Sequence, residues 1–379
     1  MRLTDDWLTA PETQAVFSML SGGGQRALAV GGCVRNALIG APVSDIDIAS
    51  DAIPERVVEL AQAAGLKVVP TGIDHGTVTV ISGGLPHEIT TFRRDVDTDG
   101  RRATVAFSTD IAEDASRRDF TMNALYAKAD GTVVDPLDGL SDLRAGHVRF
   151  IRDPAERIIE DYLRILRFFR FTAWYGDPEL GLDAEGLAAC AEHAEGLDRI
   201  SAERIGTELR KLLAAPDPAP VVSAMAQTGI LARVLPGSDA KTLAVLIHLA
   251  PDADWIARLA LLGGNATGLR LSKAETRTLE ALTRSARDAT APFALGDMLG
   301  ARAIDALHIR AALLGQPASE VDLAEARRGA DQAFPLVAAD LMPELEGPAL
   351  GQGLARARVL WRDRKGDISK PDLIAAART

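Results

Sequence analysis

Two aspartates placed two residues apart, Asp45 and Asp47, are the strongest candidates for chemistry in this chain. They lie in the segment 44–50, which alternates acidic and Ile positions, a periodicity typical of a β-strand. Side chains two apart on a strand point to the same face, so the two carboxylates are expected to lie side by side. Such a pair favours a divalent cation such as Mg²⁺. The spacing therefore predicts a two-metal site that activates an attacking hydroxyl group and stabilises a leaving group.

A pair of glycines, Gly31 and Gly32, lies upstream of these acids and follows a short apolar strand candidate over 27–30. The pair opens a predicted helix over 32–39, and bare backbone N–H groups at a helix start can hold phosphate. Arg35 lies one turn inside that helix and can add a charge-assisted contact. Neither GxxxxGK[ST] nor a GxGxxG after a strand is found, so the common phosphate loops do not fit.

The segment Arg117-Arg118-Asp119 places two arginines beside an acid. Guanidinium groups bind phosphate oxygens through charge-assisted hydrogen bonds, and a carboxylate accepts hydrogen bonds from hydroxyl groups. The segment could therefore hold a triphosphate and a ribose. Taken alone, it is explained at least as well by an ion-pair cluster on the surface.

A further row of charges occupies every third position of a second predicted helix, which runs from Pro154 to about Trp174, at Asp161, Arg164, Arg167 and Arg170. Neighbours at i, i+3 lie on one side of a helix. The positions between them are almost all apolar, so the charges must face partners or a cleft. The alternative is that the arginines extend their charged ends from between packed helices.

The pair Asp161 and Arg164 has the right chemistry to recognise a nucleotide base. Cytosine and adenine each show an amino donor beside a ring-nitrogen acceptor, whereas guanine and uracil show a carbonyl acceptor beside an N–H donor. A carboxylate accepts from the amino group, and a guanidinium donates to the ring nitrogen. One Asp–Arg pair can therefore accept C and A and reject G and U, at about 1–3 kcal/mol for each lost contact.

The composition bounds the class of protein. A chain of 379 residues predicts two to four domains, and 47% hydrophobic residues without a membrane-length apolar run predict a cytoplasmic globular protein. The net charge of −11 argues against a general nucleic-acid binder, although clustered arginines could form local basic surfaces. Cys33 and Cys190 have no CxxC partner and are expected to be reduced structural thiols.

The pattern along the chain predicts an α+β fold, with strands in about the first 145 residues and helices after them. A glycine pair at 83–84 and Asp130-Gly131 indicate hairpins. Residues 93–104 are charged and predict a loop. The predicted helices span 54–64, 201–213 and a single helix from Pro154 to about Trp174.

In their order along the chain, these segments resemble the motifs of a known family, the class II CCA-adding enzymes (tRNA nucleotidyltransferases) and bacterial poly(A) polymerases. The resemblance covers about 25–175 and continues weakly over 201–213. The segments that carry it are GGCVRNALIG…SDIDIAS, TGIDHGTVTV, EITTFR, RRDFTMNAL, DPLDGLSDLRAGHVRF and EDYLRILRFFRF.

The resemblance implies a nucleotidyltransferase head like that of DNA polymerase β over 1–145, a helical neck for base recognition over 146–215, and a helical body and tail for RNA binding over 216–379. It implies addition of C, C and A to the tRNA 3′ end from CTP and ATP, with Mg²⁺ and release of pyrophosphate. The implied roles are metal binding for Asp45 and Asp47, phosphate contact for Gly32 and Arg35, ribose and phosphate contact for Arg118 and Asp119, a protein template for C and A in Asp161 and Arg164, and neighbouring nucleotide contacts for Arg167 and Arg170.

Other activities share these motifs and stay open at this point. The first alternative is a poly(A) polymerase or a relative that adds only A or only CC. A glycosyltransferase with a DxD motif or a catalytically inactive RNA-binding protein is disfavoured by the other motifs and by the intact acids. Glu88 is a candidate third acid, 93–106 falls where the family has a flexible loop needed for A addition, and Asn36 stands where the family more often has Asp.

Overall fold

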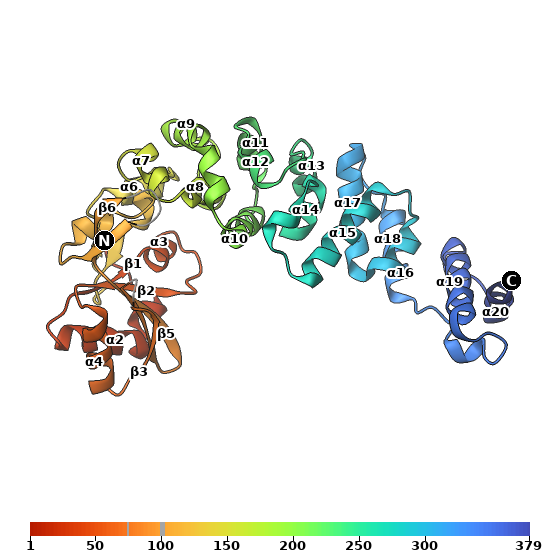
Figure 1. Cartoon of the computed structure of the whole chain (residues 1–379), viewed down its shortest axis with the longest axis horizontal. Helices are drawn as coiled ribbons and strands as arrows, with labels where there is room; N and C mark the ends of the chain where they lie inside the picture. Colours follow the sequence, from red (N-terminus) through yellow and green to blue (C-terminus); the bar gives the residue numbers. More distant parts are fainter. Residues whose placement is uncertain (74–75, 99–102) are drawn as a thin grey trace. The chain divides into compact units, whose positions relative to one another are not determined.

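The structure, a computed structural model, describes residues 1–73, 76–98 and 103–379. The chain divides into two compact units, Met1–Ile200 and Ser201–Thr379. The first unit contains two β-sheets, and the second is built from helices (Figure 1). The predicted α+β fold, with strands first and helices after them, is therefore confirmed.

A seven-stranded sheet forms the centre of the first unit, with the strand order β3-β4-β5-β2-β1-β8-β9. β2 and β5 pair in parallel, and the other neighbouring pairs are antiparallel. The predicted strands and both predicted hairpins are present, whereas β3 had not been predicted. The strands are β1 (Ala27–Val30), β2 (Ile46–Ser50), β3 (Lys67–Gly72), β4 (Thr77–Ser82), β5 (Leu85–Thr91), β8 (Tyr126–Ala127) and β9 (Val133–Val134).

Two helices that contact each other cover one face of this sheet, α2 (Pro11–Gly22) and α4 (Pro54–Ala63). Each begins with a proline, whose fixed φ suits the first helical position. They bury apolar side chains such as Leu20 and Val57 against the sheet. The unit also contains α1 (Asp6–Thr9), α3 (Gly32–Leu38), α5 (Ile111–Ser116), η2 (Thr121–Asn123), α6 (Gly139–Ala145), α9 (Ala184–Glu192) and η3 (Ala194–Arg199).

The segment predicted to be a loop at 93–104 contains strands instead. β6 (Arg93–Thr98) and β7 (Ala103–Phe107) form a separate antiparallel pair, in which Arg93 lies opposite Phe107. Residues 99–102, at the centre of the predicted loop, lie outside the described residues. The prediction gave too much weight to the charged residues and too little to the sequence ATVAF, whose β-branched and aromatic residues favour a strand.

The single helix predicted from Pro154 to Trp174 is two helices, α7 (Pro154–Glu160) and α8 (Leu163–Tyr175). Between them Asp161 has an extended backbone, with φ −154° and ψ 103°. Its carboxylate accepts a hydrogen bond from the Leu163 N–H at 3.1 Å, and its carbonyl accepts one from the Arg164 N–H at 2.9 Å. Asp competes in this way for backbone N–H groups and favours the start of a helix over its interior. Asp161 therefore ends α7, and α8 begins two residues later at Leu163.

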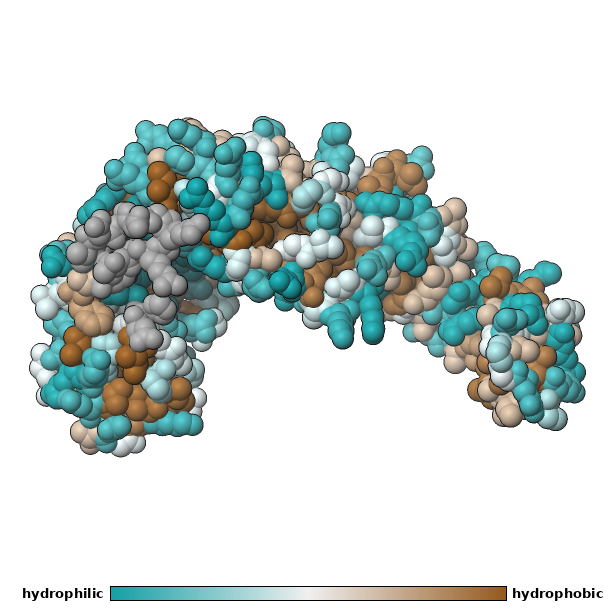
Figure 2. Space-filling model, in the orientation of Figure 1, coloured by the Kyte–Doolittle hydropathy of each residue, from teal (hydrophilic) through white to brown (hydrophobic). Residues whose placement is uncertain are grey.

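The second unit begins with α10 (Ala202–Leu213), where the Ser201 side chain accepts a hydrogen bond from the Arg204 N–H, as predicted for a capping serine. None of the described helices is long and apolar enough to cross a membrane. On the face drawn in Figure 2, apolar residues form patches among polar ones. The other helices are α11 (Ala219–Gln227), α12 (Ile230–Val234), α13 (Leu243–Leu249), α14 (Trp255–Leu262), α15 (Lys273–Arg287), α16 (Pro292–Leu299), α17 (Ala303–Leu314), α18 (Glu320–Asp331), α19 (Gly347–Asp363) and α20 (Lys370–Arg378).

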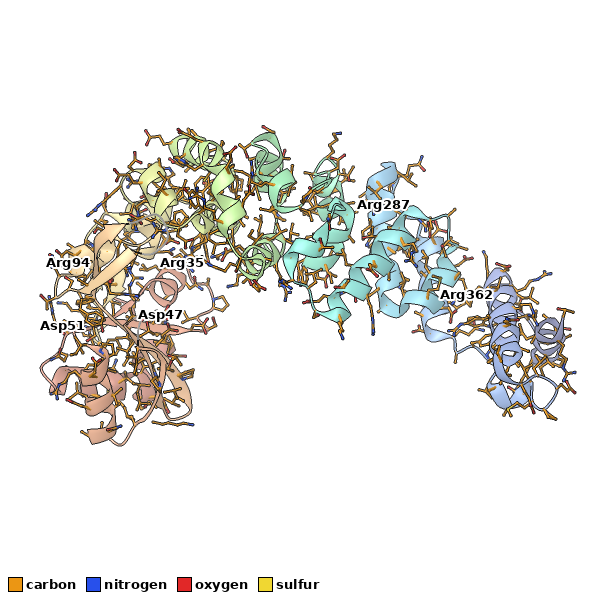
Figure 3. The ribbon with its side chains drawn as sticks, in the orientation of Figure 1. Arg35, Asp47, Asp51, Arg94, Arg287 and Arg362 are labelled. Atoms are coloured by element: carbon orange, nitrogen blue, oxygen red, sulfur yellow. The ribbon has the colours of Figure 1, made fainter. Side chains whose placement is uncertain are left out.

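Part of the arginine cluster near the end of the chain has an internal role. Arg358 and Arg362 of α19 both bind the carboxylate of Asp297 in α16, with Arg358 at 2.8 and 2.5 Å and Arg362 at 2.5 Å. Arg362 is labelled in Figure 3. These two charges join helices within the second unit, so they contribute less to a basic surface than their spacing in the sequence suggests.

The two cysteines are free and buried, as predicted. Burial raises the pKa of the Cys33 thiol to about 11, above its ordinary value. A thiol that stays protonated is a poor nucleophile and a poor metal ligand. Cys33 is therefore a core residue of α3.

Candidate active site

The carboxylates predicted to bind metal lie at the edge where β2 begins. Asp47 is the second residue of β2 and pairs in register with Glu88 of the parallel strand β5. Asp45 lies one residue before the strand, is exposed, and accepts a hydrogen bond from the Ser44 hydroxyl at 3.0 Å. The sequence thus places three acids at neighbouring positions, including the candidate third acid Glu88.

These acids affect one another electrostatically. Burial, and to a smaller extent the nearby carboxylates of Glu88 and Asp45, raise the pKa of Asp47 to about 6, although Arg118 acts to lower it. A cation bound beside Asp47 would offset this repulsion, and carboxylate oxygens are the ligands that Mg²⁺ prefers. The described residues include no ready group of three or more His, Cys, Asp or Glu side chains that could hold a metal. Mg²⁺ commonly binds through one or two carboxylates together with substrate phosphates, so the pair fits it.

The glycine pair lies close to two arginine side chains. Gly31 has a φ of 71°, in the left-handed region that favours glycine, and α3 begins at Gly32. A Cβ atom on Gly31 would lie 3.4 Å from Nη1 of Arg118, and one on Gly32 would lie 3.9 Å from Nη2 of Arg35. The structure therefore brings together all four of these predicted residues, with positive charge next to exposed backbone. Figure 3 labels Arg35 on α3 and Asp47 on β2.

Arg35 is buried, and its hydrogen bonds go to neutral oxygen atoms. Nη1 donates to Oδ1 of Asn123 at 2.5 Å, and Nη2 donates to the hydroxyl of Tyr175 at 2.9 Å. Nε and Nη2 also donate to Oδ1 of Asn36, at 3.2 and 2.9 Å. Burial lowers the pKa of Arg35 below its ordinary value. Asp119 offsets part of this charge from a distance, but no carboxylate is hydrogen-bonded to Arg35 among the described residues, which favours binding of an anion.

Arg118 is held by a carboxylate and a phenol. Its Nε and Nη2 donate to Oδ2 of Asp114 at 3.3 and 3.1 Å, and its Nε also donates to the Tyr126 hydroxyl at 3.2 Å. The Tyr126 hydroxyl in turn donates to Asp114 at 2.8 Å. Asp114 is 2% exposed, so this network is a structural support that fixes the direction of the Arg118 guanidinium group.

Asp119, the predicted ribose contact, is bound on both oxygen atoms. Oδ2 accepts from Nε and Nη2 of Arg167 at 2.7 and 2.5 Å, and Oδ1 accepts from the Asn123 amide at 2.8 Å and the Phe120 N–H at 2.9 Å. Burial alone would raise the pKa of Asp119, but Arg167 and these hydrogen bonds outweigh it and lower the pKa to about 2. Asp119 is therefore a charged anchor for α8.

The base-reading candidates Asp161 and Arg164 lie on either side of the helix start and not on one helix. Nη1 of Arg164 donates to Glu160 at 2.5 Å and to the Arg157 carbonyl at 2.7 Å, and Nη2 donates to the Arg117 carbonyl at 3.3 Å. Its Nε has no partner among the described residues. Arg164 thus reaches the arginine segment at 117–119 while it retains a free donor for a ligand.

The charged residues of this segment share one environment. The four predicted positions, Asp161, Arg164, Arg167 and Arg170, are half-buried, whereas most residues between them are buried. The ring of Phe171 lies 5.1, 5.3 and 4.5 Å from the guanidinium carbons of Arg35, Arg167 and Arg170. The predicted charged face is therefore present on α8, and the ring of Phe171 contacts the guanidinium groups of three arginines.

Three residues of this site had no predicted role: Asn123, Phe171 and Tyr175. Asn123 connects Arg35 to Asp119, and the two aromatic residues contact Arg35 from α8. Asn123 lies in the RRDFTMN segment, so its position beside the charged residues was a usable signal. Phe171 and Tyr175 are ordinary apolar-face residues of a helix, and their contact with α3 is visible only in the fold.

Two segments of the chain match described families. Residues 27–149 match the family described as the poly A polymerase head domain. Residues 180–242 match the family described as the probable RNA- and SrmB-binding site of polymerase A. The first match contains the glycine pair, the acids and the RRD segment.

Curated relatives match about half of the chain. The mitochondrial CCA tRNA nucleotidyltransferase 1 of Homo sapiens is 47% identical over 184 residues, which cover 48% of this chain and 42% of that protein. The CCA-adding enzyme of Levilactobacillus brevis is 41% identical over 217 residues, which cover 57% of this chain and 53% of that protein. The chain spans about half the length of the curated relatives it matches.

Solved structures match nearly the whole chain. The Bacillus stearothermophilus CCA-adding enzyme in complex with CTP has a TM-score of 0.69 and 28% identity, covering 97% of this chain and 91% of that chain. The Thermotoga maritima CCA-adding enzyme complexed with tRNA-CCA has a TM-score of 0.69 at 19% identity, which shows the fold alone. Residues 27–149 therefore belong to the poly A polymerase head family, and the chain as a whole is similar to CCA-adding enzymes.

Proposed function

We propose that this chain adds C, C and A to the 3′ end of tRNA, from CTP and ATP and without a nucleic-acid template. One observation carries the proposal: the acids around Asp47 and the arginines around the glycine pair belong to one unit, with Arg118 near both. The names of the curated relatives, CCA tRNA nucleotidyltransferase and CCA-adding enzyme, support the choice of tRNA. The solved structure with CTP supports the choice of nucleotide.

In this proposal Asp45 and Asp47 hold Mg²⁺. The ion, when bound, supplies the positive charge that a nucleotidyl transfer needs at the attacking and leaving oxygen atoms. Glu88, in register with Asp47, adds negative charge to the same edge of the sheet and strengthens its attraction for a cation. The transfer joins the 3′ oxygen of the RNA to the α-phosphorus of the nucleotide and releases pyrophosphate.

Gly31, Gly32, Arg35 and Arg118 bind the triphosphate. The glycines leave backbone N–H groups open to a phosphate at the start of α3, and the two arginine heads lie beside them. Asp119 lies next to Arg118. We propose that its carboxylate positions Arg167 and the ribose of the nucleotide.

Asp161 and Arg164 select the base, with Arg167 and Arg170 as neighbouring contacts. The Asp161 carboxylate accepts from the amino group of C or A, and a free donor of Arg164 binds the adjacent ring nitrogen. Guanine and uracil present the opposite pattern, so neither of these two contacts to the base can form. The helix start at Asp161 holds its carboxylate by the hydrogen bond from the Leu163 N–H.

The functional division of the chain follows from these roles. We propose a catalytic head over 1–145, a neck for base recognition over 146–215, and a body and tail that bind RNA over 216–379. The break between the two compact units at Ile200 falls inside the proposed neck, so the neck contributes α7, α8 and α9 to the first unit and α10 to the second. The cytoplasmic location expected from the sequence stays a prediction.

Sequencing of RNA 3′ ends tests the function. A tRNA transcript that ends at the nucleotide before CCA is incubated with the full chain, Mg²⁺ and all four nucleoside triphosphates. The proposal predicts products that end in CCA and stop there. Long A tails would support a poly(A) polymerase, and products ending in CC or a single added A would support a partial enzyme.

A further inference from the structure

Tyr175, the last residue of α8, contacts Arg35 of α3 in two ways. Its hydroxyl accepts a hydrogen bond from Nη2 of Arg35 at 2.9 Å, and its ring centroid lies 4.2 Å from the guanidinium carbon. Tyr175 is half-buried. The hydrogen bond restrains one nitrogen and the stacking restrains the plane, so together they restrict the rotation of this guanidinium group.

The restrained nitrogen is the one that lies beside the glycine pair. Nη2 is 3.9 Å from the position of a Cβ atom on Gly32, at the start of α3. The partners of Arg35 among the described residues are amide oxygens, a hydroxyl and aromatic rings, all of which are neutral. A buried cation with neutral partners is costly, and the cost falls when an anion binds.

The position of Tyr175 is itself fixed by the end of α8. Its ring lies 5.4 Å from the ring of Phe171, one helical turn earlier. Gly176 ends the helix, and a Cβ atom there would lie 2.6 Å from the Thr172 carbonyl oxygen. The next residue, Asp177, then donates its N–H to the Gly146 carbonyl at 2.9 Å. The hydroxyl therefore approaches Arg35 from a well-supported helix end.

We propose that Tyr175 is a positioning residue for the nucleotide's phosphate groups, which it serves by holding Arg35 toward the glycine pair. The inference rests on the proposed function and deepens it. Tyr175 acts through Arg35 and has no part in reading the base, because Asp161 and Arg164 lie at the opposite end of α8. It therefore supports CTP and ATP equally.

Calorimetric binding of CTP and of cytidine to the full chain tests this role. Tyr175→Phe keeps the ring and removes the hydroxyl. We expect the Kd of CTP to rise about fivefold to tenfold, in line with the loss of one typical hydrogen bond, while the Kd of cytidine is unchanged. Tyr175→Leu also removes the stacking, and it should raise the Kd of CTP by about another factor of ten.

Steady-state kinetics give a second readout. In Tyr175→Phe the KM for CTP and for ATP should rise by the same factor, with kcat within about twofold of wild type. Tyr162→Phe is the matched control. It removes a hydroxyl group from the same stretch of chain, and that hydroxyl has no hydrogen bond among the described residues. Combination with Arg35→Lys should abolish the effect of Tyr175→Phe, because the tyrosine acts through the arginine.

Three results would overturn the inference: an unchanged Kd for CTP in both Tyr175 variants, an equal loss for CTP and cytidine, or an undiminished effect in the Arg35→Lys background. The binding measurements need no turnover, so they are separable from the proposed function. A chain that binds CTP through Tyr175 but extends no tRNA would contradict only the proposed function.

Discussion

The carboxylate of Asp119 accepts two hydrogen bonds from the guanidinium group of Arg167, at 2.7 and 2.5 Å. The pair joins the segment that follows α5 to the middle of α8. Asn123 connects this pair to Arg35 of α3, because its amide donates to Asp119 and its side-chain oxygen accepts from Arg35. Arg35, which is proposed to bind phosphate, and Arg167, which is proposed as a neighbouring nucleotide contact, are therefore held in one network of charged and amide groups.

Replacement of Asp119 by Asn should remove a contribution to stability that depends on pH in the wild-type chain. The pKa of Asp119 is about 2 in the folded chain and about 4 in an unfolded one, so the charged form stabilises the fold. This contribution is fully present above pH ~4 and is lost as the pH falls toward 2. The melting temperature of wild type should exceed that of Asp119→Asn by a constant amount near neutral pH, and the gap should close in acid. A gap that widens in acid would contradict the assignment.

Loss of Asp114 should destabilise the first unit, because it removes the buried carboxylate that holds the half-buried Arg118. Removing one partner of a buried ion pair costs about 3–5 kcal/mol. We expect Asp114→Asn to lower the free energy of unfolding in urea by an amount toward the lower end of that range, since Tyr126 still contacts Arg118. The control is Glu59→Gln, which breaks the exposed Arg56–Glu59 pair and should cost less than about 1 kcal/mol. Equal effects of the two variants would show that the Asp114 network is not a structural support.

Removal of either predicted metal-binding carboxylate should abolish nucleotide addition without unfolding the chain. Asp45 is exposed and Asp47 is half-buried at the start of β2, so we expect the fold to tolerate Ala at both positions. Activity should fall to a few percent of wild type or less in Asp45→Ala and Asp47→Ala, with unchanged circular dichroism. Glu55→Ala, at an exposed position in the first turn of α4, is the control. Substantial turnover in either aspartate variant would refute the two-carboxylate site.

Shortening the β6–β7 hairpin should impair A addition more than C addition. This segment falls where the resemblance implies an element needed for A, and its charged strands form their own two-stranded sheet, apart from the central one. We expect replacement of residues 95–105 by a short glycine-serine turn to leave C addition within about threefold of wild type and to reduce A addition more than tenfold. Rates of CTP addition to tRNA without CCA and of ATP addition to tRNA ending in CC give the comparison. Equal losses would assign the hairpin to general binding.

Asp161→Ala and Arg164→Ala should relax base selection while addition continues. Each variant loses one of two contacts, about 1–3 kcal/mol, so discrimination against U or G should fall about tenfold to a hundredfold. The measurement is incorporation of each of the four nucleotides on tRNA lacking CCA. Wild-type preference in both variants would leave Arg164 as a structural residue, since it already binds Glu160 and the Arg157 carbonyl.

Local patterns predicted the parts of the fold that depend on neighbours in sequence. The alternation in TVTVIS and the glycine pair at 83–84 are enough to define the β4–β5 hairpin, and Ser201 is enough to start α10. The break at Asp161 was missed because residues 154–174 favour a helix throughout, and only the competing hydrogen bond to the Leu163 N–H ends it. The strand pair at 93–107 was missed because its many charged residues favour a loop, although its β-branched residues favour a strand.

Within the site, the residues with unusual chemistry were predictable and their supports were not. Asp45, Asp47, Arg35 and Arg118 come from short motifs, and the structure places them in one unit. Asn123 and Tyr175 reach Arg35 across 88 and 140 residues of chain. No local periodicity can report such a contact, because it depends on how α8 packs beside α3.

Stepwise extension of two tRNA substrates tests the central claim most directly. One transcript ends before CCA and the other ends in CC, and each is offered CTP alone or ATP alone with wild type and with Asp47→Asn. The account predicts that CTP adds two residues to the first transcript, that ATP adds one residue to the second only, and that Asp47→Asn adds none. Repeated ATP addition to either transcript by wild type, or extension by Asp47→Asn, would contradict it.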